Sequence, residues 1–139
     1  MSKQYKGDIT PQETWKNLSD NQNSILVDVR TFAEWKLVGV PNISELSKQP
    51  HFIEWVDFPD GHINENFAKQ LHSVAPSLDT PIYFLCRTGV RSIAAAIKAT
   101  ESGYTHCYNI LEGFEGKQDE AGHRGKVSGW QGRNLPWNH

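Results

Sequence analysis

The sequence predicts an α/β domain in which helices cover both faces of a central parallel β-sheet. Short apolar runs alternate along the chain with stretches whose apolar residues recur at helical spacing. This alternation is typical of parallel strands joined by crossover helices. A chain of 139 residues is long enough to bury the core of one such domain. We therefore expect a single domain over residues 1–139, with its core at about 10–137.

The first part of the chain carries two helix-start signals. Residues 10–13 read Thr-Pro-Gln-Glu, a capping box with proline at the first helical position. An apolar strand is predicted over 24–29, and a second capping box, Thr-Phe-Ala-Glu, follows over 31–34. A short helix begins there and presents Phe32 and Trp35. The segment 39–50 is expected to be irregular.

The middle of the chain is predicted to contain one more strand and a helix. The strand covers 52–58 and ends at the Pro-Asp-Gly turn over 59–61. Asn64 is the expected N-cap of the helix. The apolar stripe of this helix consists of Phe67, Leu71 and Val74.

The last predicted elements are two strands with a helix between them. The strands cover 82–85 and 106–111, and the helix covers 92–102, where a glycine ends it. Residues 113–132 include six glycines among charged residues, so a loop-rich closure is expected there rather than a second domain. The Leu-Pro-Trp segment at 135–137 is expected to pack back onto the body.

The composition excludes several classes of partner. Net charge is −2, with 14 basic and 16 acidic side chains, so no strong field favours nucleic acid or an anionic membrane. No apolar run approaches the ~18 residues of a membrane span, and the N-terminus lacks a signal-peptide pattern. The six histidines show no metal-ligand spacing. We expect a soluble, cytoplasmic protein without a metal or an organic cofactor.

A reactive cysteine is predicted where the strand over 82–85 ends. Cys86 lies between that strand and a helix, at the edge of a parallel sheet where ligands usually bind. Backbone amides of a short loop and a helix N-terminus form an anion site, which stabilises a thiolate. We therefore expect Cys86 to be an exposed loop thiol, largely ionised at neutral pH, that acts as a nucleophile.

The residues after the cysteine are predicted to bind an anionic substrate. They are Arg87, Thr88, Gly89, Val90 and Arg91. The amides of 88–90 are expected to face the sulfur, and Gly89 permits the dihedral angles of a tight loop. Of the two arginines, Arg91 is the one expected to face the sulfur, while Arg87 steers substrates at the mouth of the site.

Other polar and sulfur-containing residues have supporting or structural roles in this prediction. Asp28 and Arg30 end the neighbouring strand, where they are expected to pair with each other or to bond Glu34. Cys107 is placed at the opposite edge of the sheet, roughly 15 Å from Cys86. A disulfide needs Cα atoms within ~7 Å, so Cys107 is expected to be a buried small hydrophobe.

Residues 86–92, Cys-Arg-Thr-Gly-Val-Arg-Ser, resemble the active-site loop of the rhodaneses, single-cysteine sulfurtransferases that carry sulfur as a cysteine persulfide. The resemblance covers about 10–137. Further similar segments occur in the family's order, at 26–30, 34–35, 103–104, 111–114, 129–130 and 135–137. The chain departs from the family at 39–43, where Gly-Val-Pro-Asn-Ile replaces the frequent Gly-His-Ile-Pro-Gly-Ala.

The resemblance implies a rhodanese-like domain that transfers sulfur. The thiolate of Cys86 would take the outer sulfur of thiosulfate or a similar donor, and cyanide, a thiol or an acceptor protein would remove it. Two alternatives remain open. A cysteine phosphatase or arsenate reductase usually counts seven residues from cysteine to arginine, whereas Cys86 to Arg91 counts six. A persulfide carrier or binding module would act through a protein partner.

Overall fold

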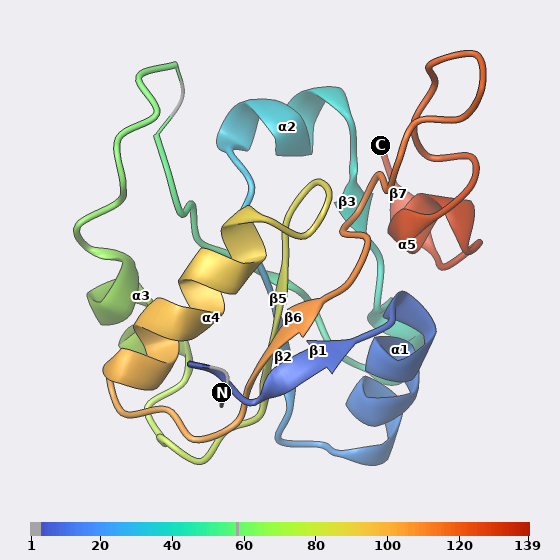
Figure 1. Cartoon of the computed structure of the whole chain (residues 1–139). Coiled ribbons are helices and arrows are strands. Elements are labelled where there is room, and N and C mark those ends of the chain that lie inside the picture. Colours follow the sequence, from blue (N-terminus) through green and yellow to red (C-terminus); the bar gives the residue numbers. More distant parts are fainter. Residues whose placement is uncertain (1–3, 58) are drawn as a thin grey trace.

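A five-stranded parallel β-sheet forms the centre of the molecule (Figure 1). The computed structural model describes residues 4–57 and 59–139. The strand order is β1-β6-β5-β2-β4, and every neighbouring pair is parallel. The strands are β1 (Gly7–Ile9), β2 (Ile25–Asp28), β4 (His51–Phe52), β5 (Ile82–Leu85) and β6 (Cys107–Ile110). The predicted fold class is therefore confirmed.

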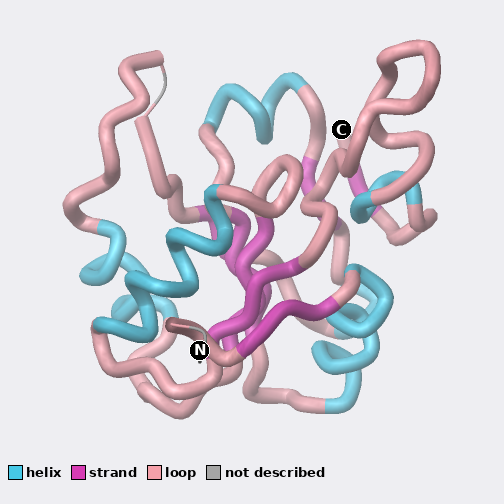
Figure 2. Tube along the Cα trace, viewed as in Figure 1, coloured by secondary structure: helices cyan, strands magenta, loops and turns pink. Residues whose placement is uncertain are grey.

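Helices cover both faces of this sheet, as Figures 1 and 2 show. The helices are α1 (Pro11–Asp20), α2 (Phe32–Leu37), α3 (Phe67–Val74), α4 (Arg91–Glu101), α5 (Gly129–Gly132) and the 3₁₀ turn η1 (Ser44–Leu46). Side chains of β5 alternate between two apolar clusters. Ile82 and Phe84 pack with α3 and α4, whereas Tyr83 and Leu85 pack with α1 and α5. None of the described helices is both long and apolar enough to cross a membrane.

Several local signals predict the structure correctly. Both capping boxes form, because the Thr10 and Thr31 side chains accept hydrogen bonds from the backbone amides of Glu13 and Glu34, whose carboxylates bond back. Gly103 follows the last turn of α4 with a φ of +109°, a conformation that glycine adopts without strain. The helices therefore begin and end close to their predicted limits.

The strand expected over 52–58, the N-cap of α3 and the first strand of the sheet differ from the prediction. The strand expected over 52–58 is only the two-residue β4, because Val56 bridges to Ile63 and the chain turns back at the predicted Pro-Asp-Gly turn. Phe58, the expected last residue of that strand, lies outside the described residues. Asn64 does not cap α3. Its side chain instead accepts a hydrogen bond from the Asn66 amide, and Asn66 is the N-cap.

The third correction is β1, which sequence periodicity does not predict. This strand has only three residues and pairs with β6 from Gly7 to Ile9. Its place at the sheet edge comes from pairing with a strand about 100 residues later, which local patterns do not report.

The C-terminal segment closes the carboxyl-terminal edge of the sheet. It is loop-rich, as expected, with α5 as a single helical turn. The tail forms β7 (Trp137–Asn138), which pairs antiparallel with β3 (Val40–Pro41) inside the segment expected to be irregular. The Trp130 indole donates a 2.7 Å hydrogen bond to the Pro136 carbonyl, which holds the tail against the body.

Candidate active site

The cysteine loop connects the end of β5 to α4 at the carboxyl-terminal edge of the sheet. Asp28, the last residue of β2, lies opposite Leu85, so the neighbouring strand ends at the same level. The Gly89 amide donates a 3.0 Å hydrogen bond to Cys86 Sγ. Gly89 has a φ of +108°, which a residue with a side chain rarely adopts. The loop is therefore folded so that a backbone donor points at the sulfur.

Cys86 is buried, contrary to the expectation of an exposed thiol. Only 1% of the residue is accessible, while Arg87 is exposed and Val90 is 73% exposed. The sulfur lies beneath the loop because Ser92 of α4 packs against it, with the two atoms 3.1 Å apart. Arg87 and Val90 thus form the rim of the site, and the sulfur lies below them.

A chain of hydrogen bonds, buried from Cys86 to Asn109, extends from the sulfur to half-buried Asp8 of β1. The Ser92 hydroxyl donates to Asn109 Oδ1 at 2.5 Å, and Asn109 Nδ2 donates to Asp8 Oδ1 at 3.0 Å. The Tyr5 hydroxyl also donates to Asp8 Oδ1, at 2.7 Å. Because the single hydrogen of Ser92 points to Asn109, the Cys86 thiol is the donor toward Ser92 Oγ in this arrangement.

Sequence reasoning did not find this network. Asp8 lies on the unpredicted β1, and Asn109 is a buried polar residue in the otherwise apolar strand β6. A buried amide or carboxylate within an apolar strand is costly unless it is hydrogen-bonded, so Asn109 was the available signal. Ser92 is the last residue of the loop motif, and its contact with Cys86 depends on the first turn of α4.

The segment over 113–115 packs against the backbone of the cysteine loop. The Phe114 amide donates to the Cys86 carbonyl at 2.7 Å, and the Glu115 amide donates to the Arg87 carbonyl at 3.0 Å. Gly113 packs so closely that a Cβ atom there would lie 2.5 Å from the Arg87 carbonyl carbon. This position therefore excludes any side chain, and the segment fixes the backbone of the cysteine loop.

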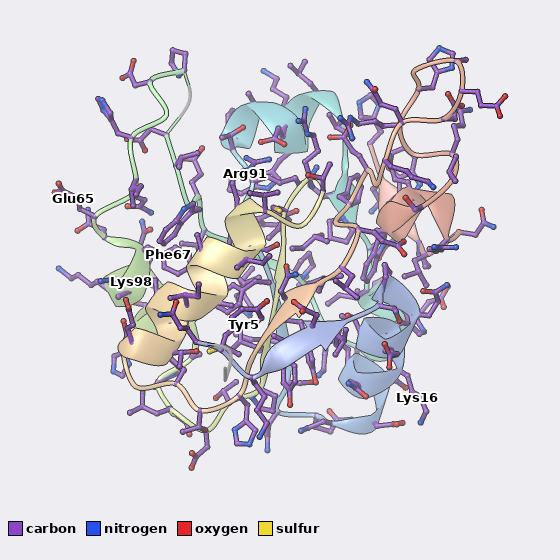
Figure 3. The ribbon with its side chains drawn as sticks, viewed as in Figure 1. Tyr5, Lys16, Glu65, Phe67, Arg91 and Lys98 are labelled. Carbon is purple, nitrogen blue, oxygen red and sulfur yellow. The ribbon has the colours of Figure 1, made fainter. Side chains whose placement is uncertain are left out.

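Arg91 is held by a carboxylate instead of pointing freely toward the sulfur. Its guanidinium donates to both oxygens of Glu34, at 2.6 and 2.8 Å. Burial opposes ionisation of Glu34, but the hydrogen bonds and charge of Arg91 outweigh it and lower the pKa of Glu34. Hydrogen bonding to Glu34 raises the pKa of Arg91 most, and the charge of Cys86 adds to this effect. The pair thus ties α2 to the start of α4, where Figure 3 labels Arg91.

Asp28 and Arg30 form a fully buried pair below the same edge. Arg30 Nη2 lies 2.6 Å from Asp28 Oδ2 and also donates to the Gly39 carbonyl. The Arg30 guanidinium carbon lies 4.2 Å from the centre of the Phe114 ring, a cation–π contact. Of the two expected arrangements, the structure contains the mutual pair, since Glu34 bonds Arg91. These residues connect β2 to the segment that supports the loop.

Cys107 lies at the other edge of the sheet, as predicted. It is fully buried and pairs in register with Ile82, the first residue of β5, whereas Cys86 follows the last residue of that strand. Burial raises the pKa of the Cys107 thiol to about 11. Both cysteines are free thiols. Only Cys86 therefore belongs to the candidate site.

Two cavities flank the cysteine loop. One, of about 380 Å³, is mostly apolar and is bordered by the Arg91–Glu34 pair. The other, of about 430 Å³, is polar and is bordered by Thr88. Among residues 4–57 and 59–139, no group of three or more His, Cys, Asp or Glu side chains is arranged to hold a metal ion.

The chain has a rhodanese-like fold, with a single-cysteine loop at the carboxyl-terminal edge of its sheet. The family model described as the STR4 middle domain matches residues 7–139, and the chain belongs to this family. It is similar to the uncharacterized protein RP600 of Rickettsia prowazekii, with 39% identity over 93% of this chain and 94% of the relative.

Two solved structures share this fold, and a more distant relative is similar in sequence. The crystal structure of Rv0390 from M. tuberculosis has 49% identity and a TM-score of 0.87, and covers 96% of this chain and 98% of that one. A polysulfide-sulfur transferase homodimer from Wolinella succinogenes shares the fold at 19% identity, with a TM-score of 0.63 over 97% of this chain and 79% of that one. The thiosulfate sulfurtransferase GlpE of Actinobacillus succinogenes is 24% identical over 80% of this chain and 83% of its own length.

Proposed function

We propose that this chain is a sulfurtransferase that moves sulfane sulfur from thiosulfate, or a similar donor, to a nucleophilic acceptor through a persulfide on Cys86. The contact that carries the proposal is the 3.0 Å hydrogen bond from the Gly89 amide to Cys86 Sγ. A fixed amide aimed at sulfur stabilises the negative charge of a thiolate or of a persulfide. The relative named as a thiosulfate sulfurtransferase supports the same class of reaction.

The first half-reaction loads the enzyme. The thiolate of Cys86 attacks the outer sulfur of thiosulfate, a bond forms between Sγ and that sulfur, and sulfite leaves with the electrons of the broken sulfur–sulfur bond. Amides of 88–90 and the N-terminus of α4 would stabilise the anions that take part. Arg87, exposed on the rim, would attract the donor, and Arg91 would add its field from the pair with Glu34.

The second half-reaction returns the enzyme to its starting state. An acceptor such as cyanide or a thiolate attacks the outer sulfur of the persulfide. The bond to Cys86 Sγ breaks, and its electron pair stays on Cys86 as a thiolate. We place this cycle in the cytoplasm, where thiols remain reduced. The physiological acceptor is then a small thiol or a thiol on a partner protein.

The proposal is tested by thiocyanate formation from thiosulfate and cyanide. We expect activity in the wild type, none in Cys86→Ser, and most of the activity in Cys107→Ser. Cys86→Ser should keep the fold because a serine oxygen can accept the same Gly89 hydrogen bond. Circular dichroism and thermal unfolding would check this point. Thiocyanate formation that survives in Cys86→Ser, or that is absent from the folded wild type, would rule out the proposed function.

A further inference from the structure

The polar cavity beside the cysteine loop carries an excess of positive charge. It has a volume of about 430 Å³. Its lining residues are Thr88, Glu112, Gly116, Lys117, Arg124, Ser128 and Arg133. Three cationic side chains therefore face one carboxylate, which leaves two positive charges without a balancing anion in the lining.

Hydrogen bonds within the protein fix two of the three cationic side chains, but a carboxylate neutralises only one of them. Arg133 is paired with Glu112, with its Nη2 2.8 Å from a carboxylate oxygen. Arg124 donates a 2.7 Å hydrogen bond to the Gly116 carbonyl, a neutral acceptor. Within the described part of the chain, the exposed ammonium group of Lys117 has no hydrogen bond or ion pair. Arg124 and Lys117 thus leave their charge available to a ligand.

This cavity begins at the cysteine loop itself. Thr88 is two residues after Cys86, so their Cα atoms are at most about 7 Å apart. The cavity on the other side of the loop is mostly apolar, and its one cation, Arg91, is neutralised by Glu34. Of these two cavities, only the one bordered by Thr88 has cationic lining residues that no carboxylate neutralises.

We propose that this cavity binds the carboxylates of an acceptor thiol, so that the enzyme favours anionic small thiols as sulfur acceptors. The proposal rests on the proposed sulfurtransferase function. The volume falls within the range of small-molecule sites and is larger than a small inorganic donor would fill. The acceptor thiolate would attack the outer sulfur of the persulfide while its carboxylates lie near Lys117 and Arg124. The products are the acceptor persulfide and the Cys86 thiolate.

The experiment isolates the second half-reaction. Enzyme loaded with sulfur is freed of donor and mixed with mercaptosuccinate, which carries two carboxylates, or with neutral 2-mercaptoethanol. The readout is the transfer rate to mercaptosuccinate divided by the transfer rate to 2-mercaptoethanol. The intrinsic reactivity of the two thiols cancels when this ratio is compared between variants. In Lys117→Ala this ratio should fall about threefold, as expected for one exposed charge, and in Lys117→Glu about tenfold. Raising the salt concentration should reduce both effects.

Lys98→Ala is the matched control, because Lys98 is an exposed lysine toward the opposite end of α4 (Figure 3). Its ratio should equal that of the wild type. Succinate, a dicarboxylate without a thiol, should compete with mercaptosuccinate in the wild type and less well in Lys117→Ala. An unchanged ratio in both Lys117 variants, with normal persulfide loading, would overturn this inference alone. Failure to load the wild type would overturn the proposed function as well.

Discussion

Ser92 is the side chain that most directly influences the reactive sulfur. Its hydroxyl lies 3.1 Å from Cys86 Sγ and donates to Asn109, which donates in turn to Asp8. When the Ser92 hydroxyl donates to Asn109, the hydrogen between Cys86 and Ser92 belongs to the thiol, so this arrangement fits a protonated Cys86. To support a thiolate or a persulfide anion, the Ser92 hydroxyl would turn from Asn109 to the sulfur. The network therefore links the charge on Cys86 to buried Asn109 of β6 and half-buried Asp8 of β1.

Replacing Ser92 with alanine should slow persulfide formation about tenfold, because a hydrogen bond to a charged group contributes ~1.5–3 kcal/mol. It should also cost about 1–3 kcal/mol of folding free energy, since Asn109 Oδ1 loses its buried donor. Loading rates with thiosulfate and urea unfolding would measure the two effects. Ser92→Thr, which keeps the hydroxyl, should restore much of the rate. Ser102→Ala, an exposed serine just after α4, is the control. A wild-type loading rate in folded Ser92→Ala would contradict this role.

At the scale of elements, the site depends on contacts between segments that are distant in the sequence. The Arg91–Glu34 pair joins α4 to α2, and the segment at 113–115 supports the backbone of the cysteine loop. Arg91 is the first residue of α4 and follows the cysteine loop directly, so these polar contacts hold the loop on both sides.

The pair between Glu34 and Arg91 should make stability depend on pH. The pKa of Glu34 is lower in the folded chain than in the unfolded chain, where a glutamate has a value of about 4.3. The stabilisation that ionised Glu34 contributes to folding is therefore complete above about pH 5. It is lost as the pH falls through the pKa of Glu34 in the folded chain. Glu34→Gln should reduce the free energy of unfolding by about 1 kcal/mol at pH 7.

Urea unfolding between pH 2.5 and 7 tests this expectation. The difference between wild type and Glu34→Gln should shrink toward zero at the acid end, where Glu34 is protonated in both states. Glu65→Gln is a suitable control, because Glu65 is exposed and forms no ion pair within the described residues (Figure 3). A stability difference that stays constant down to the lowest pH would show that the charge of Glu34 does not act in this way.

The sequence predicts features that depend on neighbouring residues better than features that depend on contacts between distant segments. Capping boxes, Gly103 and the buried strand before Cys86 act within a few residues, and these predictions match the structure. The burial of Cys86 and the contact from Ser92 through Asn109 to Asp8 require β1, β6 and α4 to be packed together. Asn109 within an apolar strand indicates a buried polar contact, but the sequence does not name its partners, because Ser92 and Asp8 come from distant elements.

At the scale of the whole molecule, the sheet keeps the two thiols apart. Cys86 follows the last residue of β5, and Cys107 lies beside the first residue of the same strand. Cys107 is buried, with a pKa raised to about 11, so it stays protonated at neutral pH. Of the two thiols, the one in the cysteine loop is therefore the candidate carrier of sulfur in the proposed cycle.

Mass spectrometry of the intact protein shows whether Cys86 carries the transferred sulfur. After incubation with thiosulfate and removal of excess donor, the wild type should gain the mass of one sulfur atom. Peptide mapping should place the added sulfur on Cys86, cyanide should remove it, and Cys107→Ser should gain the same mass. No mass gain in the folded wild type, or a gain located on Cys107, would contradict the account.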